Sequence, residues 1–382
     1  MSQPLAHSTP GQAGGSGLSF AELGIAPDLV AALAKAGITT PFPVQAATIP
    51  GILAGRDVSG KARTGSGKTL AFGLPLIMRT PRAEPRRPRA VVLVPTRELA
   101  SQVVANLAPL AAGRGLRIAP IVGGVSLFGQ RQRLRSGVDI VVATPGRLND
   151  LLERNDASMS DVQVAVLDEA DQMADLGFLP QVRRILDRIP NQHQTLLFSA
   201  TLDGEVDALV KRYQHDPVTH EVAAPEEDEA AMQHRFVGVD EADKVRVTAR
   251  IAAGPERTLL FVRTQRGADR LAKQLDREGV AAGVIHGGLS QPRRERALSD
   301  FARGHVPVLV ATNIAARGIH VDGVDIVVHH DPPEDAKTYL HRSGRTARAG
   351  ASGLVVTLVS PEQRRDVDIL RRQAGVREAV VA

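Results

Sequence analysis

The sequence has no cysteine, no tryptophan and no apolar run long enough to cross a membrane. The absence of cysteine excludes disulfides, thiolate metal sites and a cysteine nucleophile from the 382 residues. A chain without cysteine fits a reducing compartment, and we expect a cytoplasmic protein. Residues 1–18 are rich in Ser, Gly, Pro and Gln and lack the basic start and apolar stretch of a signal peptide. We interpret them as a disordered tail.

Aromatic residues are also scarce, at 3% of the chain. An interleaved aromatic platform for stacking bases is therefore not expected, and a bound nucleic acid would be held by its sugar-phosphate backbone. The net charge is +5, and seven of the 47 basic residues are Lys, the others being Arg. This Arg excess suits phosphate binding, although a GC-rich coding sequence would give the same bias.

Short β-branched runs alternate with helical stretches along both halves of the chain. This alternation predicts an α/β fold in which mostly parallel sheets are flanked by helices. The expected helices include Leu70–Ile77, Arg97–Ala112 and Asp203–Tyr213. The expected strands are Asp57–Gly60, Ala90–Pro95, Ile118–Val122, Asp139–Ala143, Val164–Leu167, Thr195–Ser199, Phe236–Val239, Thr258–Val262, Ala282–Ile285, Val308–Ala311, Ile326–His329 and Leu354–Leu358.

A change of composition separates the two halves. The segment Ala223–Ala231 reads AAPEEDEAA, which is acidic and poor in large apolar residues. Such a composition is typical of an exposed linker. We therefore predict a linker at 223–232 between two α/β domains of similar size, 19–222 and 233–382.

The run Ala62–Thr69, ARTGSGKT, lies between an expected strand and an expected helix. It follows the phosphate-loop pattern, except that Ala62 stands where the first Gly is usual. Small residues let backbone N–H groups curl around phosphate, and the helix N-terminus adds partial positive charge. An incidental Gly-rich turn is the alternative interpretation. The residues expected to bind a nucleoside triphosphate here are Thr64, Gly65, Ser66, Gly67, Lys68 and Thr69.

An acidic cluster follows the apolar run Val164–Leu167, about a hundred residues beyond the phosphate loop. In phosphate-loop enzymes an Asp at this place holds Mg2+, and a neighbouring Glu can orient the attacking water and accept its proton. Asp168 and Glu169 fit these two roles. The alternative is a helix N-terminus at which acidic residues stabilise the dipole, but the preceding phosphate loop favours catalysis.

The letters DEAD at Asp168–Asp171 are the signature of the DEAD-box RNA helicases, and the sequence resembles that family from Phe20 to about Gly375. About ten short motifs stand in the family's order, and we expect the chain to fall in the bacterial RhlE-like branch. The motifs of the first half are Phe20, PFPVQ ending at Gln45, ARTGSGKT, PTRELA (Pro95–Ala100), Gly123–Gly124, TPGR (Thr144–Arg147), DEAD and SAT (Ser199–Thr201). Those of the second half are LLFVRT (Leu259–Thr264), HGGLSQPRR (His286–Arg294), ATNIAARGIH (Ala311–His320) and HRSGRTARAG (His341–Gly350).

The resemblance implies two tandem RecA-like (P-loop NTPase) domains that clamp one ATP between them. Phe20 would stack on the adenine ring, and Gln45 would read its edge, because an amide carries both a donor and an acceptor. His320 stands where relatives bond the ribose. Arg345 and Arg348 would reach the γ phosphate as arginine fingers. The implied catalytic set is Lys68, Asp168, Glu169, Arg345 and Arg348, with Thr69 and Asp168 on Mg2+.

The resemblance also implies an RNA site that is not sequence-specific. Contacts to phosphates give affinity without sequence preference, and contacts to 2′-hydroxyls favour RNA over DNA. The implied RNA contacts are Pro95, Thr96, Arg97, Gly123, Gly124, Thr144, Pro145, Arg147, Thr264, Gln291, Arg294 and Thr312. Ser199, Thr201 and His341 would couple the domains, although Thr201 could instead cap the helix expected at Asp203. Ribosome assembly and RNA degradation are both compatible settings.

Five positions besides Ala62 depart from the family pattern, and one of them is Arg63, which stands where Gln is common in the phosphate loop. His320 replaces an Asp in the fifth motif, and Asn313 stands where Asp is frequent. Gly288 replaces the Asp of the usual HGD, and Ala347 replaces a Gly in the sixth motif. Loss of a charged acceptor at His320 would weaken ATP binding by about 1–2 kcal/mol. Two alternatives therefore stay open: a weakly catalytic RNA-binding clamp or scaffold, and a DNA translocase with the same engine.

Overall fold

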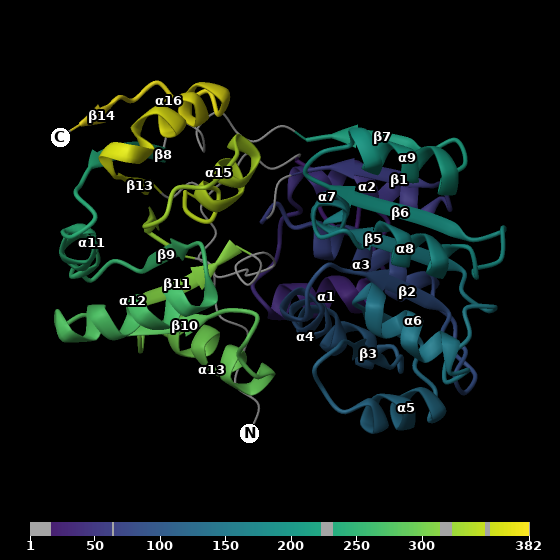
Figure 1. Cartoon of the computed structure of the whole chain (residues 1–382). Coiled ribbons are helices and arrows are strands. Elements are labelled where there is room, and N and C mark those ends of the chain that lie inside the picture. Colours follow the sequence, from purple (N-terminus) through teal and green to yellow (C-terminus); the bar gives the residue numbers. More distant parts are fainter. Residues whose placement is uncertain (1–16, 63–64, 223–231, 314–322, 348–351, 382) are drawn as a thin grey trace. The chain divides into compact units, whose positions relative to one another are not determined.

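The computed structural model describes residues 17–62, 65–222, 232–313, 323–347 and 352–381. The chain divides into two compact units, Met1–Ala224 and Pro225–Ala382, and each contains a seven-stranded sheet with helices around it (Figure 1). The expected linker segment Ala223–Ala231 and residues 1–16 of the expected tail lie outside the described residues. Within the described part of the chain, no helix is long and apolar enough to span a membrane.

The first unit has a sheet of order β3-β4-β2-β5-β6-β1-β7 in which every neighbouring pair is parallel. Its strands are β1 (Val58–Lys61), β2 (Ala90–Leu93), β3 (Ile118–Ile121), β4 (Ile140–Ala143), β5 (Val164–Asp168), β6 (Gln194–Ser199) and β7 (Val218–Glu221). Its helices include α1 (Pro27–Lys35), α2 (Pro43–Leu53), α3 (Lys68–Arg79), α4 (Arg97–Gly113), α5 (Leu127–Arg135), α6 (Pro145–Glu153), α7 (Ala170–Asp175), α8 (Leu179–Leu186) and α9 (Gly204–Tyr213).

The second unit has a sheet of order β10-β11-β9-β12-β13-β8-β14, again with parallel pairs throughout. Its strands are β8 (Met232–Gly238), β9 (Thr258–Val262), β10 (Ala282–Ile285), β11 (Val308–Thr312), β12 (Ile326–His329), β13 (Gly353–Val359) and β14 (Val380–Val381). Its helices include α11 (Lys244–Ala252), α12 (Gln265–Arg277), α13 (Gln291–Ala302), α15 (Ala336–Ser343), the 3-10 helix η1 (Pro361–Gln363) and α16 (Arg364–Gln373).

The two sheets have the same topology when strands are counted from the start of each unit. Parallel sheets flanked by helices confirm the predicted fold class. The expected strands are all present; three have the predicted bounds, and the ends of the others differ by at most four residues. The edge strands β7 and β14 were not predicted. β7 reads VTHE and alternates between half-buried and exposed residues, and β14 has only two residues, so neither has the continuous apolar run that marks the central strands.

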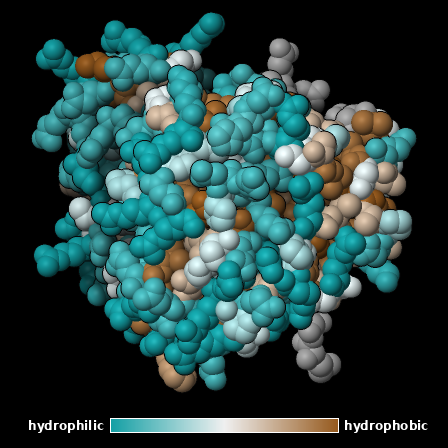
Figure 2. Space-filling model, turned by 90° about the vertical axis from the view of Figure 1, so that its right-hand side faces the viewer, coloured by the Kyte–Doolittle hydropathy of each residue, from teal (hydrophilic) through white to brown (hydrophobic). Residues whose placement is uncertain are grey.

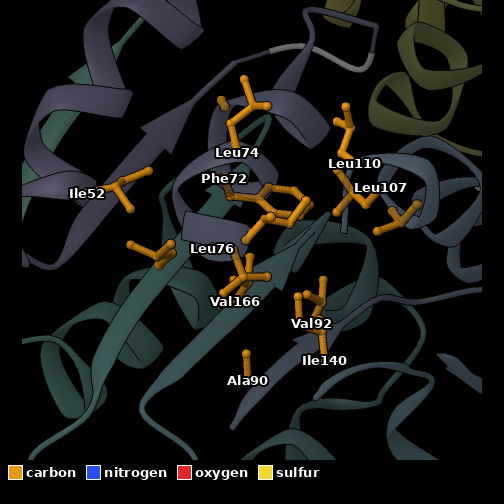
Figure 3. Close-up of a cluster of buried hydrophobic side chains, with 14 of the residues drawn as sticks. Ile52, Phe72, Leu74, Leu76, Ala90, Val92, Leu107, Leu110, Ile140 and Val166 are labelled. Carbon is orange, nitrogen blue, oxygen red and sulfur yellow. The ribbon is translucent and has the colours of Figure 1, made fainter. Parts of the chain in front are cut away.

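The core of the first unit lies on both faces of its sheet. Because successive side chains of a strand point to opposite faces, Ala90 and Val92 of β2 join one apolar cluster while Val91 and Leu93 join another. Figure 3 shows the first cluster, in which Phe72 lies among aliphatic side chains. Polar residues cover most of the surface visible in Figure 2. Burial on both faces leaves the strand ends and their loops to carry polar chemistry.

Candidate nucleotide site and RNA interface

Three of the predicted motifs follow neighbouring strands of the first sheet. The phosphate loop follows β1, the DEAD segment begins at the end of β5, and the SAT segment begins at the end of β6. Since β5, β6 and β1 are adjacent and parallel, their carboxyl ends meet at one edge, which is where such sheets bind ligands. The backbone N–H of Ala62 donates to the carbonyl of Ser199 at 2.9 Å, joining two of these segments.

The phosphate loop ends at Gly67, the N-cap of α3, which has a left-handed φ of 86°. A Cβ at this position would overlap the side chains of Gln45 and Phe42, so glycine is required. Lys68 follows and is only 5% exposed. Its Nζ donates to the carbonyl oxygen of Ala62 at 2.9 Å. The loop therefore holds a buried ammonium group at the start of a helix.

Gly65 is exposed, and Ser66 and Thr69 are half-buried. Thr64 lies outside the described residues.

The acidic pair is buried beside this lysine. Nζ of Lys68 lies 3.4 Å from Oε1 of Glu169. The Asp168 carboxylate accepts from the N–H of Glu169 at 3.0 Å, and burial raises the pKa of Asp168 to about 7, with the Lys68 charge opposing the shift. Glu169 has a left-handed φ of 55°, a conformation that is strained for a residue with a side chain and that is common at functional positions.

The SAT segment contacts the DEAD segment directly. The N–H of Asp171 donates to Oγ of the fully buried Ser199 at 3.1 Å. The suggested capping role of Thr201 is wrong, because α9 is N-capped by Asp203 and has no side-chain cap bond. Oγ1 of Thr201 is instead buried and has no hydrogen-bond partner among the described residues.

The two predicted adenine contacts are buried in the first unit. Gln45 is 1% exposed; its Oε1 accepts from the N–H of Phe42 at 2.9 Å, and its Nε2 donates to the carbonyl of Gly67 at 3.0 Å. Gln45 thus connects the start of α2 to the phosphate loop. Phe20 is 2% exposed and belongs to the same apolar cluster as Phe72. Their contacts with adenine stay predictions.

Several predicted RNA contacts of the first unit form one group around the Gly123–Gly124 pair. A Cβ on Gly124, whose φ is 71°, would overlap the guanidinium of Arg97, so that guanidinium packs against the glycine. Arg147 donates through Nη1 to the carbonyl of Val125 at 3.2 Å. Two arginines therefore flank this loop, and guanidinium groups are suited to binding phosphate.

The remaining predicted RNA contacts of this unit begin helices or precede them. Thr96 caps α4, and its Oγ1 accepts from the N–H of Leu99 at 3.2 Å. Thr144 is the N-cap of α6 without a side-chain cap bond, which leaves its hydroxyl to other partners. Pro95 and Pro145 are buried.

In the second unit, predicted RNA contacts lie at the ends of β9 and β11, which are neighbours in the sheet. Thr264 caps α12, and its Oγ1 accepts from the N–H of Gly267 at 3.0 Å. Thr312 ends β11 and is 6% exposed. Gln291 begins α13 and donates to Oε1 of Glu295 at 3.2 Å. Arg294, one turn further along the same helix, is also buried.

The sixth motif contains an arginine that the sequence analysis did not select. Arg342 donates through Nε to Oδ1 of Asn313 at 2.5 Å and through Nη1 to the carbonyl of Asp331 at 2.8 Å. Its guanidinium also lies 5.0 Å from the ring centre of Phe261. The unusual Asn313 therefore serves as the acceptor for Arg342, a pairing that the joint presence of both motifs could have indicated.

The predicted arginine finger Arg345 is 7% exposed, and the predicted coupling residue His341 is half-buried on α15. Arg348 and His320 lie outside the described residues. The described part of the chain also holds no group of three or more His, Asp or Glu side chains that could bind a metal ion by themselves.

A phosphate loop at the end of β1, facing a buried acidic pair at the end of β5, defines the first unit as that of a P-loop nucleoside triphosphatase. The DEAD/DEAH box helicase family model matches residues 42–209, and the helicase conserved C-terminal domain model matches residues 243–350. The chain belongs to the DEAD-box ATP-dependent RNA helicase family. Its more specific placement in the RhlE-like branch stays a prediction.

Similar proteins occur in bacteria, archaea and eukaryotes. The DEAD-box ATP-dependent RNA helicase CshA of Bacillus subtilis (strain 168) is 38% identical over 349 residues, which cover 91% of this chain and 70% of that protein. The structure of S. cerevisiae Dbp5 bound to RNA and ADP BeF3 is 30% identical and covers 95% of both chains with a TM-score of 0.83. A DEAD box protein from Methanococcus jannaschii is 32% identical, with coverage of 95% and 99% and a TM-score of 0.55.

Proposed function

We propose that this protein is a cytoplasmic ATP-dependent RNA helicase, which couples ATP binding and hydrolysis to clamping of single-stranded RNA and to local unwinding or RNP remodelling. The observation that carries the proposal is the buried pair of Lys68 and Glu169, with Nζ 3.4 Å from Oε1, at the ligand-binding edge of a parallel sheet. A buried ion pair has a large desolvation cost, and an apolar pair at the same place would stabilise the fold at least as well. Fold stability alone therefore does not explain these two charges.

In this proposal Lys68 exchanges its present partners for the β and γ phosphates of ATP. Its contacts with the Ala62 carbonyl and with Glu169 hold the ammonium in the phosphate loop until the nucleotide arrives. Glu169 is then released to orient the attacking water and to accept its proton. Arg345 and Arg348 act as arginine fingers from the second unit.

The residues present suit Mg2+ as the partner of the nucleotide. A carboxylate and a hydroxyl, from Asp168 and Thr69, are the hard oxygen ligands that Mg2+ prefers, and phosphate oxygens and water complete such sites. The raised pKa of Asp168 indicates a buried carboxyl without enough compensating positive charge. Bound Mg2+ would supply that charge and stabilise the charge that develops on the phosphates.

RNA is gripped by its backbone in this proposal. The group of Arg97, Gly124 and Arg147 supports phosphate binding in the first unit, and Thr264, Arg294 and Thr312 would extend the strand's contacts to the second. Because ATP and RNA each touch both units, each ligand contributes part of the free energy that closes them.

The decisive experiment measures ATP turnover without nucleic acid, with single-stranded RNA and with DNA of the same sequence. Stimulation by RNA and not by DNA is expected. Equal stimulation by DNA would instead identify a translocase, and RNA binding without turnover would identify a scaffold. Titration of RNAs of equal length at several salt concentrations should give affinities that fall steeply with salt and vary little with sequence. A 100-fold preference for one sequence would contradict backbone recognition.

A further inference from the structure

The most exposed large hydrophobic side chain among the described residues belongs to Phe128, which is 72% exposed. It is the second residue of α5, the helix that follows the Gly123–Gly124 pair. Gln130 and Leu134 are buried and anchor α5, whereas Phe128, Gln132 and Arg135 are exposed at helical spacing on another face. The ring of Phe128 therefore does not pack in the core, and core stability does not explain a phenylalanine at this position.

The helix that carries this ring is fixed to the sheet. Oε1 of Gln130 accepts from the N–H of Val122 at 3.1 Å, and Nε2 of Gln130 donates to the carbonyl of the same residue at 2.9 Å. Ser126 caps the helix by accepting from the N–H of Gly129 at 3.4 Å. The Phe128 ring is thus presented from a rigid element, which lowers the entropy lost when a ligand binds it.

The loop before α5 contains the Gly123–Gly124 pair and is the part of the first unit that we propose binds the phosphates of RNA. The Arg97 guanidinium packs against Gly124, and Arg147 donates to the carbonyl of Val125. Phe128 follows Gly124 by four residues, so at most about 14 Å of chain separates them. A strand held by the two arginines would have its bases within reach of the ring.

The charge around the ring matches a polyanion. α5 contains Arg131, Arg133 and Arg135 and no acidic residue. Arg131 is paired with Asp156 at 2.8 Å, while Arg133 and Arg135 are exposed. A cationic helix with one exposed aromatic ring has the composition of a single-stranded nucleic-acid contact, in which phosphates meet cations and a base meets the ring. A partner protein with an apolar surface would form no favourable electrostatic contact with these arginines.

We propose that Phe128 stacks on one base of the RNA strand held by the group of Arg97, Gly124 and Arg147, which adds a base contact to a site that otherwise binds the backbone. The proposal rests on the RNA-binding function proposed above. The ring is accessible to a base, because the Phe128 side chain is 72% exposed. Since every base has a π face, the contact adds affinity with little sequence preference.

The absence of tryptophan from the chain permits a direct optical test. Phe128→Trp introduces a single indole, whose fluorescence should be quenched by single-stranded RNA in the presence of a non-hydrolysable ATP analogue. Ile369→Trp is the matched control, because Ile369 is a 46% exposed hydrophobic residue in α16 to which no ligand is assigned. An unchanged Phe128→Trp spectrum with RNA demonstrably bound would overturn the proposal.

Affinity measurements test the same contact without a probe. Phe128→Ala should weaken RNA binding about 5- to 10-fold, at the lower end for one stacked base, and leave the salt dependence unchanged. Arg147→Ala should reduce the slope of log affinity against log salt by about 1, as for loss of a phosphate contact. A Phe128→Ala variant that binds RNA like the unmodified protein would remove the stacking role and leave the backbone site intact.

Phe128→Leu separates stacking from apolar docking. Leucine keeps much of the apolar surface and loses the π face, so it should resemble Ala in RNA binding, while Trp should equal or exceed Phe. Full recovery of RNA binding by leucine would show that the contact needs apolar surface and no π face, contrary to the proposal. If the unmodified protein failed to bind RNA at all, the proposed helicase function itself would be wrong.

Discussion

At the scale of single residues, three buried charged side chains at the ligand-binding edge of the first sheet determine which ligands this site can bind. Asp168, Glu169 and Lys68 are all at most 5% exposed. Ions removed from water are unfavourable unless they have partners, so their burial favours binding of a charged ligand that completes the set. In the proposed site Mg2+ would lie against the carboxylates and the phosphates of ATP against Lys68, so that each buried charge would gain an opposite partner.

Removal of the Glu169 charge should separate ATP binding from hydrolysis. Glu169→Gln keeps the size of the side chain and abolishes its ability to accept a proton. Turnover should fall by about 100-fold or more, as for loss of a catalytic base, while ATP affinity stays similar. Steady-state ATPase assays and nucleotide titrations measure the two quantities. Glu205→Gln, at an exposed position of α9, is the control, and near-normal hydrolysis by Glu169→Gln would exclude the assigned role.

Ala347 is a second residue in a strained conformation. It has a φ of 52°, in the left-handed region that glycine adopts freely. Ala347→Gly should therefore raise the free energy of unfolding by about 1 kcal/mol. Chemical denaturation provides the measurement. Ala297→Gly, inside helix α13, should have the opposite effect and lower stability by about 1 kcal/mol; destabilisation by both changes would show that Ala347 is not strained.

At the scale of elements, β12, β13 and α15 share a buried polar network in the second unit. Nδ1 of the fully buried His329 lies 3.0 Å from Oγ1 of Thr357, and the His329 and Tyr339 rings meet edge-to-face at 5.0 Å. The Tyr339 hydroxyl lies 2.7 Å from Nδ1 of His234. Burial, reinforced by the Arg342 charge, holds the pKa of His329 well below its usual value of 6.5.

This histidine should make the second unit sensitive to acid. Below pH 6.5 the unfolded chain protonates His329 while the folded chain keeps it neutral, so the unfolded state binds more protons. The free energy of unfolding is therefore greatest above pH 6.5 and should fall by up to about 1.4 kcal/mol per pH unit as the solution is acidified. Denaturation of His329→Gln should show a shallower pH dependence.

His305→Gln, a change of the same kind at an exposed position, is the control for this measurement. If the free energy of unfolding of His329→Gln changed with pH as steeply as that of the unmodified protein, His329 would not be the source of the pH dependence. His234 contributes in the same direction, since burial also lowers its pKa.

At the scale of the whole molecule, two units of one topology carry complementary parts of the proposed engine. The phosphate loop and the acidic pair belong to the first unit, and Arg345 and Arg348 belong to the second. In the proposed mechanism neither unit has all the catalytic residues by itself, so turnover would require that ligands bring the units together. Such a division would make ATP hydrolysis depend on RNA.

Labels on the two units should report this closure. Because the chain has no cysteine, Ser136→Cys and Glu278→Cys, both at exposed positions, give one label site on each unit. The distance between the labels should shorten with an ATP analogue and RNA together, and less with either alone, because each ligand supplies part of the closing free energy. Resonance energy transfer provides the measurement. An identical distance with and without both ligands would contradict the clamp mechanism.

The arginine finger can be tested in the same labelled protein. Arg345→Ala should reduce turnover by roughly 1000-fold while ATP binding to the first unit changes little, because the lost contact is strongest with the developing charge on the γ phosphate. Closure should be retained in large part. Loss of ATP binding in this variant would instead indicate a structural role for Arg345.

Much of the fold was predictable because it depends on local patterns. Continuous apolar runs such as Val164–Leu167 indicated strands buried on both faces, and intervening helical spacing indicated parallel connections. The phosphate loop and the acidic pair were predictable because their chemistry requires particular residues at fixed spacing. Of the four edge strands in the described part of the chain, β7 and β14 were not predictable, because β7 reads VTHE with no buried residue and β14 has only two residues.

The sequence by itself determined which residues could bind phosphate, Mg2+ and RNA, since these capacities belong to side-chain chemistry and local spacing. Only the tertiary structure decided how those residues are held. In the folded chain both ends of the Gln45 amide form hydrogen bonds within the protein, and Asn313 accepts a hydrogen bond from Arg342. Phe128 is exposed close to the Gly123–Gly124 loop. Such outcomes depend on which distant segments pack together, and packing is a property of the whole folded chain that no short motif contains.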